Sequence, residues 1–182
     1  MGGKYLFKIL TVGVPEYQKS ILLKRYTSGQ FDSDTKETIG VDFAIHYLES
    51  PNNEGAATLQ IWDFGEHERF GSMVPSFCQG ASGALLYFDL LFPLSVMALE
   101  IYIQHIRRNT RDIPLLLCGL NYSRIKNPKD LEPDHTEIVL KFIKQHNLNG
   151  YVSIDIKTGF QVNEMFEKIT VLMINHHLDR YK

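Results

Sequence analysis

The sequence predicts an α/β protein with a doubly wound, mostly parallel sheet, and three observations support this prediction. Apolar runs rich in β-branched and aromatic residues alternate with segments of helical period along the 182 residues. Several of these runs contain almost no polar residue, which is typical of strands covered by helices on both faces. The length suits one domain over residues 1–182, and no internal repeat interrupts it.

The expected strands are short apolar runs bounded by turn residues: Tyr5–Val12, Val41–Leu48, Thr58–Trp62, Ala84–Phe88, Pro114–Cys118 and Tyr151–Ile154. A turn-rich link at 49–57 separates the second run from the third, so we expect an antiparallel pair there. The expected helices are amphipathic segments: Lys19–Ser28, Leu94–Arg108, Asp134–His146 and Gln161–His177. In such sheets, ligands bind beyond the carboxyl ends of the strands.

Composition excludes some partners. Nineteen basic and 21 acidic residues leave a formal charge of −2, which offers no electrostatic attraction for nucleic acid. No apolar run reaches membrane-spanning length, and the chain ends without a cysteine for prenylation, so we expect no membrane anchor of its own. Two cysteines, Cys78 and Cys118, make no disulfide framework, which favours a reducing, cytoplasmic location.

The first expected strand runs into the loop Gly13-Val14-Pro15-Glu16-Tyr17-Gln18-Lys19-Ser20. A strand, a tight loop and a helix that begins with Lys-Ser are typical of a P-loop, whose backbone N–H groups hold phosphate oxygens. Gly13, Lys19 and Ser20 occupy the required positions. We interpret the loop, Tyr17 included, as a candidate nucleotide site. The alternative is that Lys19 and Ser20 only begin a surface helix.

Three residues of this loop oppose phosphate binding. Gln18 stands where the pattern has a glycine, and Pro15 removes one N–H group from the cradle. Glu16 adds a carboxylate where a phosphate would lie. Two unit negative charges about 4 Å apart repel by roughly 4 kcal/mol at an effective dielectric constant near 20.

Further stretches follow in a consistent order: Thr38-Ile39-Gly40-Val41-Asp42-Phe43, Trp62-Asp63-Phe64-Gly65-Glu66-His67-Glu68-Arg69-Phe70, 78–89 and Lys157-Thr158-Gly159. Together with the loop, they resemble the motifs of the Ras superfamily, nearest its Rab and Rab-like branch. The resemblance implies a P-loop small-GTPase fold with six strands, one antiparallel at the edge, and about five helices. It also implies protein partners at the switch regions, about 29–48 and 63–80, and a monomer or weak homodimer.

In that family, a serine, a threonine and an aspartate organise magnesium and the γ-phosphate. Ser20, Thr38 and Asp63 match them, so the resemblance implies Mg²⁺ with GTP or GDP if nucleotide binds at all. The family's next two features are a glycine that meets the γ-phosphate and a glutamine that orients water. Glu66 and His67 replace them. His67 is therefore the candidate catalytic residue, and we expect at most slow GTP hydrolysis.

The family reads guanine with an Asn-Lys-x-Asp segment and a Ser-Ala-Lys segment. Here these segments are Leu120-Asn121-Tyr122-Ser123 and Asp155-Ile156-Lys157. Asn121 and Lys157 remain as candidate nucleotide contacts, and the bulkier Ile156 crowds the expected base site. Ser123 replaces the aspartate that accepts two hydrogens from guanine, a loss worth about 10⁴-fold in selectivity.

Two hypotheses follow, and they belong to different classes. The first is a pseudoGTPase: a protein-interaction module with weak or absent guanine-nucleotide binding, favoured by the altered residues at positions 16, 18, 66, 67 and 123. The second is a GTP/GDP switch with slow hydrolysis, favoured by the retained magnesium set. An unrelated α/β enzyme is a third possibility, but no other catalytic cluster supports it.

Overall fold

A computed structural model of the chain describes residues 4–13, 16–34, 41–49, 55–64, 74–125 and 133–180, with the backbone alone at 16, 17, 64, 74 and 133–136. Within these residues, six strands form one sheet in the order β2-β3-β1-β4-β5-β6. The strands are β1 (Tyr5–Gly13), β2 (Val41–Glu49), β3 (Ala56–Phe64), β4 (Gly83–Asp89), β5 (Leu115–Leu120) and β6 (Tyr151–Ser153). Only the pairing of β2 with β3 is antiparallel, as predicted.

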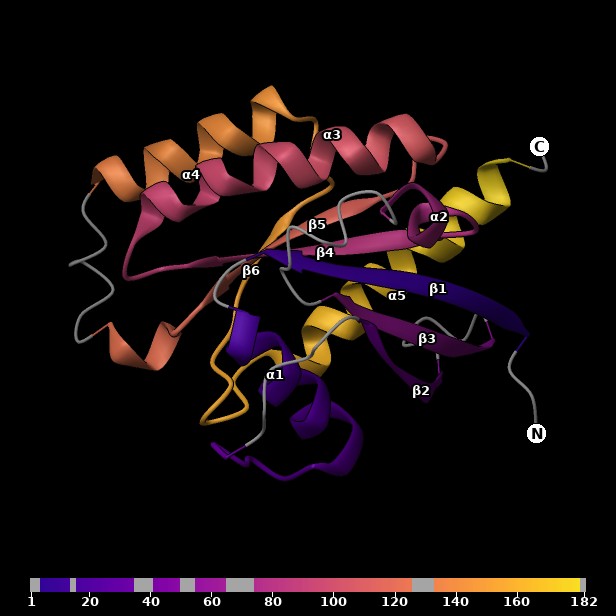
Figure 1. Ribbon diagram of the computed structural model, residues 1–182, viewed down its shortest axis with the longest axis horizontal. Coiled ribbons are helices and arrows are strands. Elements are labelled where there is room, and N and C mark those ends of the chain that lie inside the picture. The colour runs from indigo at the N-terminus through magenta and orange to yellow at the C-terminus, as the bar shows by residue number, and fades with distance from the viewer. Residues whose placement is uncertain are drawn as a thin grey trace.

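Helices cover both faces of the sheet: α1 (Glu16–Ser28), α2 (Val74–Cys78), α3 (Leu99–Asn109), α4 (Pro133–Gln145) and α5 (Val162–Asp179). Figure 1 shows α3 and α4 on one face and α1 and α5 on the other. Alternate residues of β4 enter the two resulting cores, Leu85 and Tyr87 on one side and Leu86 and Phe88 on the other. This double coverage explains why the central strands are apolar on both faces.

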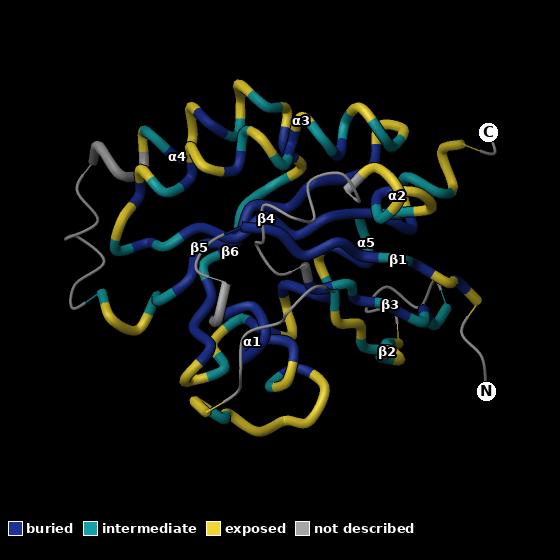
Figure 2. The backbone as a smooth tube through the Cα atoms, viewed as in Figure 1, coloured by how far each residue is buried: buried dark blue, intermediate teal, exposed yellow. Residues whose placement is uncertain are grey.

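Edge strand β2 differs from the central strands. Its residues are half-buried or exposed, whereas β4 and β5 are almost wholly buried, a contrast that Figure 2 makes visible. The outer face of β2 is therefore accessible, and its alternating pattern is that of a strand with one covered face.

Two element boundaries depart from expectation by more than two residues. Helix α1 begins at Glu16 rather than Lys19, so only residues 14 and 15 separate it from β1. The first part of the predicted helix Leu94–Arg108 is instead a 3₁₀ segment, η2 (Pro93–Ala98), which precedes α3. The Ser95 hydroxyl joins this segment to the end of β4, because it accepts a hydrogen bond from the Asp89 backbone N–H at 3.0 Å.

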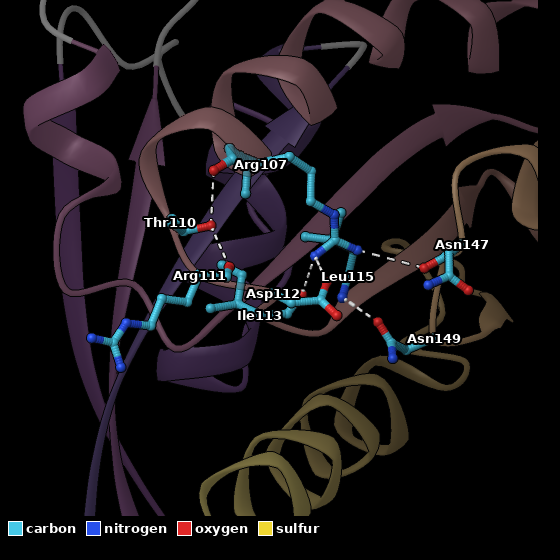
Figure 3. Close-up of polar contacts among 9 residues, drawn as sticks. Arg107, Thr110, Arg111, Asp112, Ile113, Leu115, Asn147 and Asn149 are labelled. Carbon is cyan, nitrogen blue, oxygen red and sulfur yellow. Dashed lines mark hydrogen bonds and ion pairs between the residues drawn. The ribbon is translucent and has the colours of Figure 1, made fainter. Parts of the chain in front are cut away.

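At the amino ends of the strands, Arg107 of α3 ties together the turns that lead into β5 and β6 (Figure 3). Its Nη1 donates to Asp112 Oδ1 and to the Ile113 carbonyl, both at 2.7 Å. Asn149 accepts the Leu115 backbone N–H at 2.8 Å. These contacts stabilise the end of the sheet that is opposite the predicted ligand edge.

Candidate functional site

Three of the predicted P-loop and metal residues, Lys19, Ser20 and Asp63, converge at the carboxyl ends of β1 and β3. Lys19 Nζ lies 3.9 Å from Asp63 Oδ1, with the two side chains only 2% and 1% exposed. The Ser20 hydroxyl donates to Asp63 Oδ2 at 3.0 Å, and the Thr11 hydroxyl lies 3.2 Å from Oδ1. The register that pairs Thr11 with Asp63 across β1 and β3 places these groups together.

This arrangement has two chemical consequences. The Lys19 ammonium is buried within ion-pair distance of a carboxylate, so a bound phosphate would share this lysine with Asp63. Ser20 and Asp63 also present two hard oxygen atoms about as far apart as adjacent ligands of an octahedral Mg²⁺ with bonds near 2.1 Å. These two residues therefore fit the metal. Within the described ranges, no group of three or more His, Cys, Asp or Glu side chains forms a metal cluster.

Gly13 serves the packing of the sheet as well as the loop. Its φ is +117°, and a Cβ atom there would lie 2.1 Å from the Tyr87 carbonyl oxygen of β4. A side chain is thus excluded by both conformation and contact. The glycine that matches the P-loop pattern is required by the fold whether or not phosphate binds.

Gln18, in the position of the missing glycine, is buried, and its side chain links the loop to the end of β5. Its Nε2 donates to Asn121 Oδ1 at 3.4 Å, and Asn121 Nδ2 donates to Asp89 Oδ1 at 2.8 Å. Asn121 adopts a left-handed conformation with φ of 68°. The structure therefore places the candidate base contact Asn121 in a chain of side-chain hydrogen bonds within the protein.

A cavity of about 250 Å³ lies where the family pattern places the base. Its lining residues come from α1, the segment that follows it, and the loops after β5 and β6: Gln18, Ile21, Phe31, Ser33, Asn121, Ser123, Arg124, Asp155, Ile156 and Lys157. The expected base residues thus surround one space. Lys157 is exposed, and its carbonyl accepts a hydrogen bond from Arg25 Nη1 at 3.2 Å.

Asp155 is the residue that sequence reasoning undervalued. Its Oδ2 accepts from the Ser123 backbone N–H at 3.0 Å and the Ser123 hydroxyl at 2.5 Å. Its Oδ1 accepts from the Thr158 backbone N–H at 2.8 Å and hydroxyl at 3.0 Å. Burial acts to raise the pKa of Asp155, but these hydrogen bonds outweigh it and lower the pKa below its usual value.

The loops after β5 and β6, which line this cavity, are also joined by aromatic stacking. The rings of Tyr122, in the 3₁₀ segment η3 (Tyr122–Arg124), and Phe160 stack at 4.6 Å. The contact between Ser123 and Asp155 could have been predicted from the sequence. Positions 123 and 155 hold serine and aspartate, whereas the family pattern has aspartate and serine at these two positions.

A second accessible feature lies in the expected switch regions. Phe43, Ile45 and Tyr47 project from one face of β2 and are 61%, 61% and 46% exposed. Phe43 stacks on Trp62 at 6.0 Å, and Trp62 contacts Phe77 of α2 at 6.3 Å. We call these five residues the switch-face apolar surface.

Several predicted site residues lie outside the description. Thr38, Glu66 and His67 are not among the described residues, nor are the side chains of Glu16 and Tyr17. Their roles therefore stay predictions. No described helix combines the length and apolar character needed to cross a bilayer.

The sheet order and the strand–loop–helix unit at Gly13 define a class, the doubly wound α/β proteins with a P-loop-type site. Residues 8–175 match the model of the Ras family. The chain is 31% identical over 174 residues to the Ras-related protein Rab-32B of Dictyostelium discoideum, covering 92% of this chain and 64% of that protein. The chain belongs to the Ras family and is Rab-like.

Other relatives agree with this assignment. Identity is 30% over 177 residues to the Ras-related protein Rab-11A of Dictyostelium discoideum, covering 97% of this chain and 79% of that protein. It is 32% over 176 residues to the human Ras-related protein Rab-4B, covering 94% and 78%. The predicted resemblance is therefore confirmed over most of the chain.

Proposed function

We propose that this Rab-like chain is a pseudoGTPase: a cytoplasmic, single-domain protein-interaction module with weak or absent guanine-nucleotide binding. The observation that carries the proposal is the burial of Lys19 against Asp63. A phosphate must compete with a carboxylate already 3.9 Å from the ammonium, in surroundings from which water is almost excluded. Charge pairs of this kind are costly to separate.

The loop itself supports the same function. Because α1 begins at Glu16, only two residues remain between β1 and the helix to curve around a phosphate. Gln18 fills the position where the family has no side chain and bonds Asn121. Glu16 and Glu66 add negative charge to the sequence at positions that face phosphate in the family.

The proposed activity is binding of protein partners through the switch regions. The support is the switch-face apolar surface, since clustered apolar side chains on one face mark interaction sites more often than scattered ones do. Strand β2 is also an edge strand, and its exposed backbone groups can pair with an extended partner segment.

A GTP/GDP switch with slow hydrolysis is the second candidate. The 3.0 Å separation of Ser20 Oγ and Asp63 Oδ2 favours it, because these oxygens fit Mg²⁺. With nucleotide present, Ser20, Asp63 and Thr38 would hold the ion, which would neutralise phosphate charge. Lys19 would then contact phosphate, and His67 would stand where the family orients water.

Thermal melting with GTP, GDP or ATP and magnesium separates the two candidates. A ligand at 100 times its dissociation constant stabilises the folded chain by about 2.7 kcal/mol, which is an easily measured shift. We expect no shift at millimolar nucleotide. A large shift with GTP that disappears with a chelator and in Lys19→Ala would contradict the pseudoGTPase and support the switch.

A further inference from the structure

The base cavity contains a carboxylate, but at the position where the family pattern has serine. Asp155 belongs to the loop after β6, and Ser123 belongs to η3 after β5. The Ser123 hydroxyl donates to Asp155 Oδ2 at 2.5 Å, so the two residues are direct partners. Aspartate and serine have thus changed places across one contact.

As a result of this exchange, contacts within the protein occupy all the acceptor positions of the Asp155 carboxylate. An ionised carboxylate has about four acceptor positions, two on each oxygen. Asp155 receives four hydrogen bonds, two from Ser123 on Oδ2 and two from Thr158 on Oδ1. The residue is also buried, at 3% exposure. Asp155 therefore has no acceptor position left for a ligand in the cavity.

Guanine and adenine differ in what they demand of such a cavity. The edge of guanine that carries N1 and N2 presents hydrogen-bond donors, whereas adenine presents an acceptor at N1 and a donor at N6. A carboxylate with two open acceptor positions therefore selects guanine, and its absence removes the difference. The Ser123 hydroxyl gives its one hydrogen to Asp155, and its single oxygen can accept from an N–H of either base, so it does not replace the paired acceptors of a carboxylate.

We infer that the exchange of carboxylate and hydroxyl between positions 123 and 155 leaves the base cavity unselective between guanine and adenine, and that the reverse exchange creates guanine selectivity. The inference rests on the proposed function, since it concerns the same cavity. Ser123→Asp alone does not suffice, because two carboxylates would then lie at hydrogen-bonding distance and repel. Only the double variant, Ser123→Asp with Asp155→Ser, leaves one carboxylate with open acceptor positions.

Saturation-transfer NMR with guanosine and adenosine tests this, because nucleosides lack phosphates and so do not depend on phosphate binding by Lys19. For the native chain we expect dissociation constants within about threefold of each other, or equally absent binding. For the double variant we expect guanosine to bind at least about tenfold more tightly than adenosine. Ser123→Asp and Ser123→Ala are the matched controls, and neither should gain this preference.

Two results overturn the inference: a native preference for guanosine of tenfold or more, or a folded double variant without any gain for guanosine. The native measurement stands even if the double variant does not fold, which circular dichroism reveals. Tight triphosphate binding by the native chain without base preference would refute the pseudoGTPase and leave this inference intact. Failure of the double variant would do the reverse.

Discussion

Lys19 Nζ lies 3.9 Å from Asp63 Oδ1, and both side chains are almost completely buried. Breaking a buried ion pair by removing one partner leaves a charge in a site of low dielectric constant. We predict that Lys19→Met lowers the free energy of unfolding by about 3 kcal/mol in urea titrations. Adding Asp63→Asn should restore part of that loss, since no unpaired charge then remains.

The matched control for this prediction is the exposed pair of Lys24 and Asp32, in which the two side chains are 47% and 40% exposed. Lys24→Met should change stability little, because water screens exposed charges. If Lys19→Met proves as stable as the native chain, the buried pair contributes nothing to the stability of the fold.

Gly13→Ala should destabilise the fold by at least about 2 kcal/mol, even with no nucleotide present. Its added Cβ would lie 2.1 Å from the Tyr87 carbonyl oxygen, and φ at +117° disfavours any side chain. Gly29→Ala is the control: φ there is +74°, but beyond its chain neighbours no atom lies within 4 Å of the added Cβ. Chemical denaturation of both variants measures the difference, and equal losses would argue against the β1–β4 contact.

Repair of the P-loop tests the account of the missing glycine. We predict that Glu16→Gly with Gln18→Gly increases GTP affinity, by up to about a thousandfold if a 4 kcal/mol repulsion is relieved. Fluorescent-nucleotide titration of the native and repaired chains gives the ratio. Unchanged affinity would show that another part of the site blocks binding.

The switch-face apolar surface should matter for binding and not for folding. We predict that Phe43→Ser with Ile45→Ser changes the free energy of unfolding by less than about 1 kcal/mol, because both side chains are 61% exposed. When immobilised and exposed to cell extract, the native chain should retain partner proteins that the double variant does not retain. Leu140→Ser, at 60% exposure on α4, is the control and should retain them. Identical retention by the two variants would contradict the proposed surface.

Acidification should weaken the contact between the loops after β5 and β6, because Asp155 accepts the hydrogen bonds that join them. Because its folded pKa lies below the ordinary value of 3.8, its ionised form stabilises the fold above that value, and the stabilisation is lost as pH falls through the folded pKa. We predict that Asp155→Asn is less stable than the native chain at pH 6 and that the difference shrinks towards pH 3. Denaturation curves across this range check it, and a constant difference would mean that the charge plays no part.

Much of the fold and part of the site were predictable from local pattern. Apolar runs predicted all six strands, because double coverage by helices demands apolar residues on both faces of the central ones, and the turn-rich link at 49–57 predicted the antiparallel edge. The family resemblance implied that Ser20 and Asp63 lie together beside the P-loop lysine, and the parallel strands β1 and β3 do present these residues at one edge. The exact start of α1 and the 3₁₀ segment before α3 were not predicted, because periodicity locates an amphipathic segment better than it locates the ends of that segment.

By itself, the sequence determined the α/β architecture, the Ras-family resemblance and the residues altered in each motif. Only the tertiary structure decided what those alterations do. Gln18 meets Asn121 across 103 positions of the chain, and Ser123 meets Asp155 across 32. Residue identity shows that a group can donate or accept a hydrogen bond. Whether a ligand or the protein uses that capacity depends on the directions that packing imposes on loops brought together from distant parts of the chain.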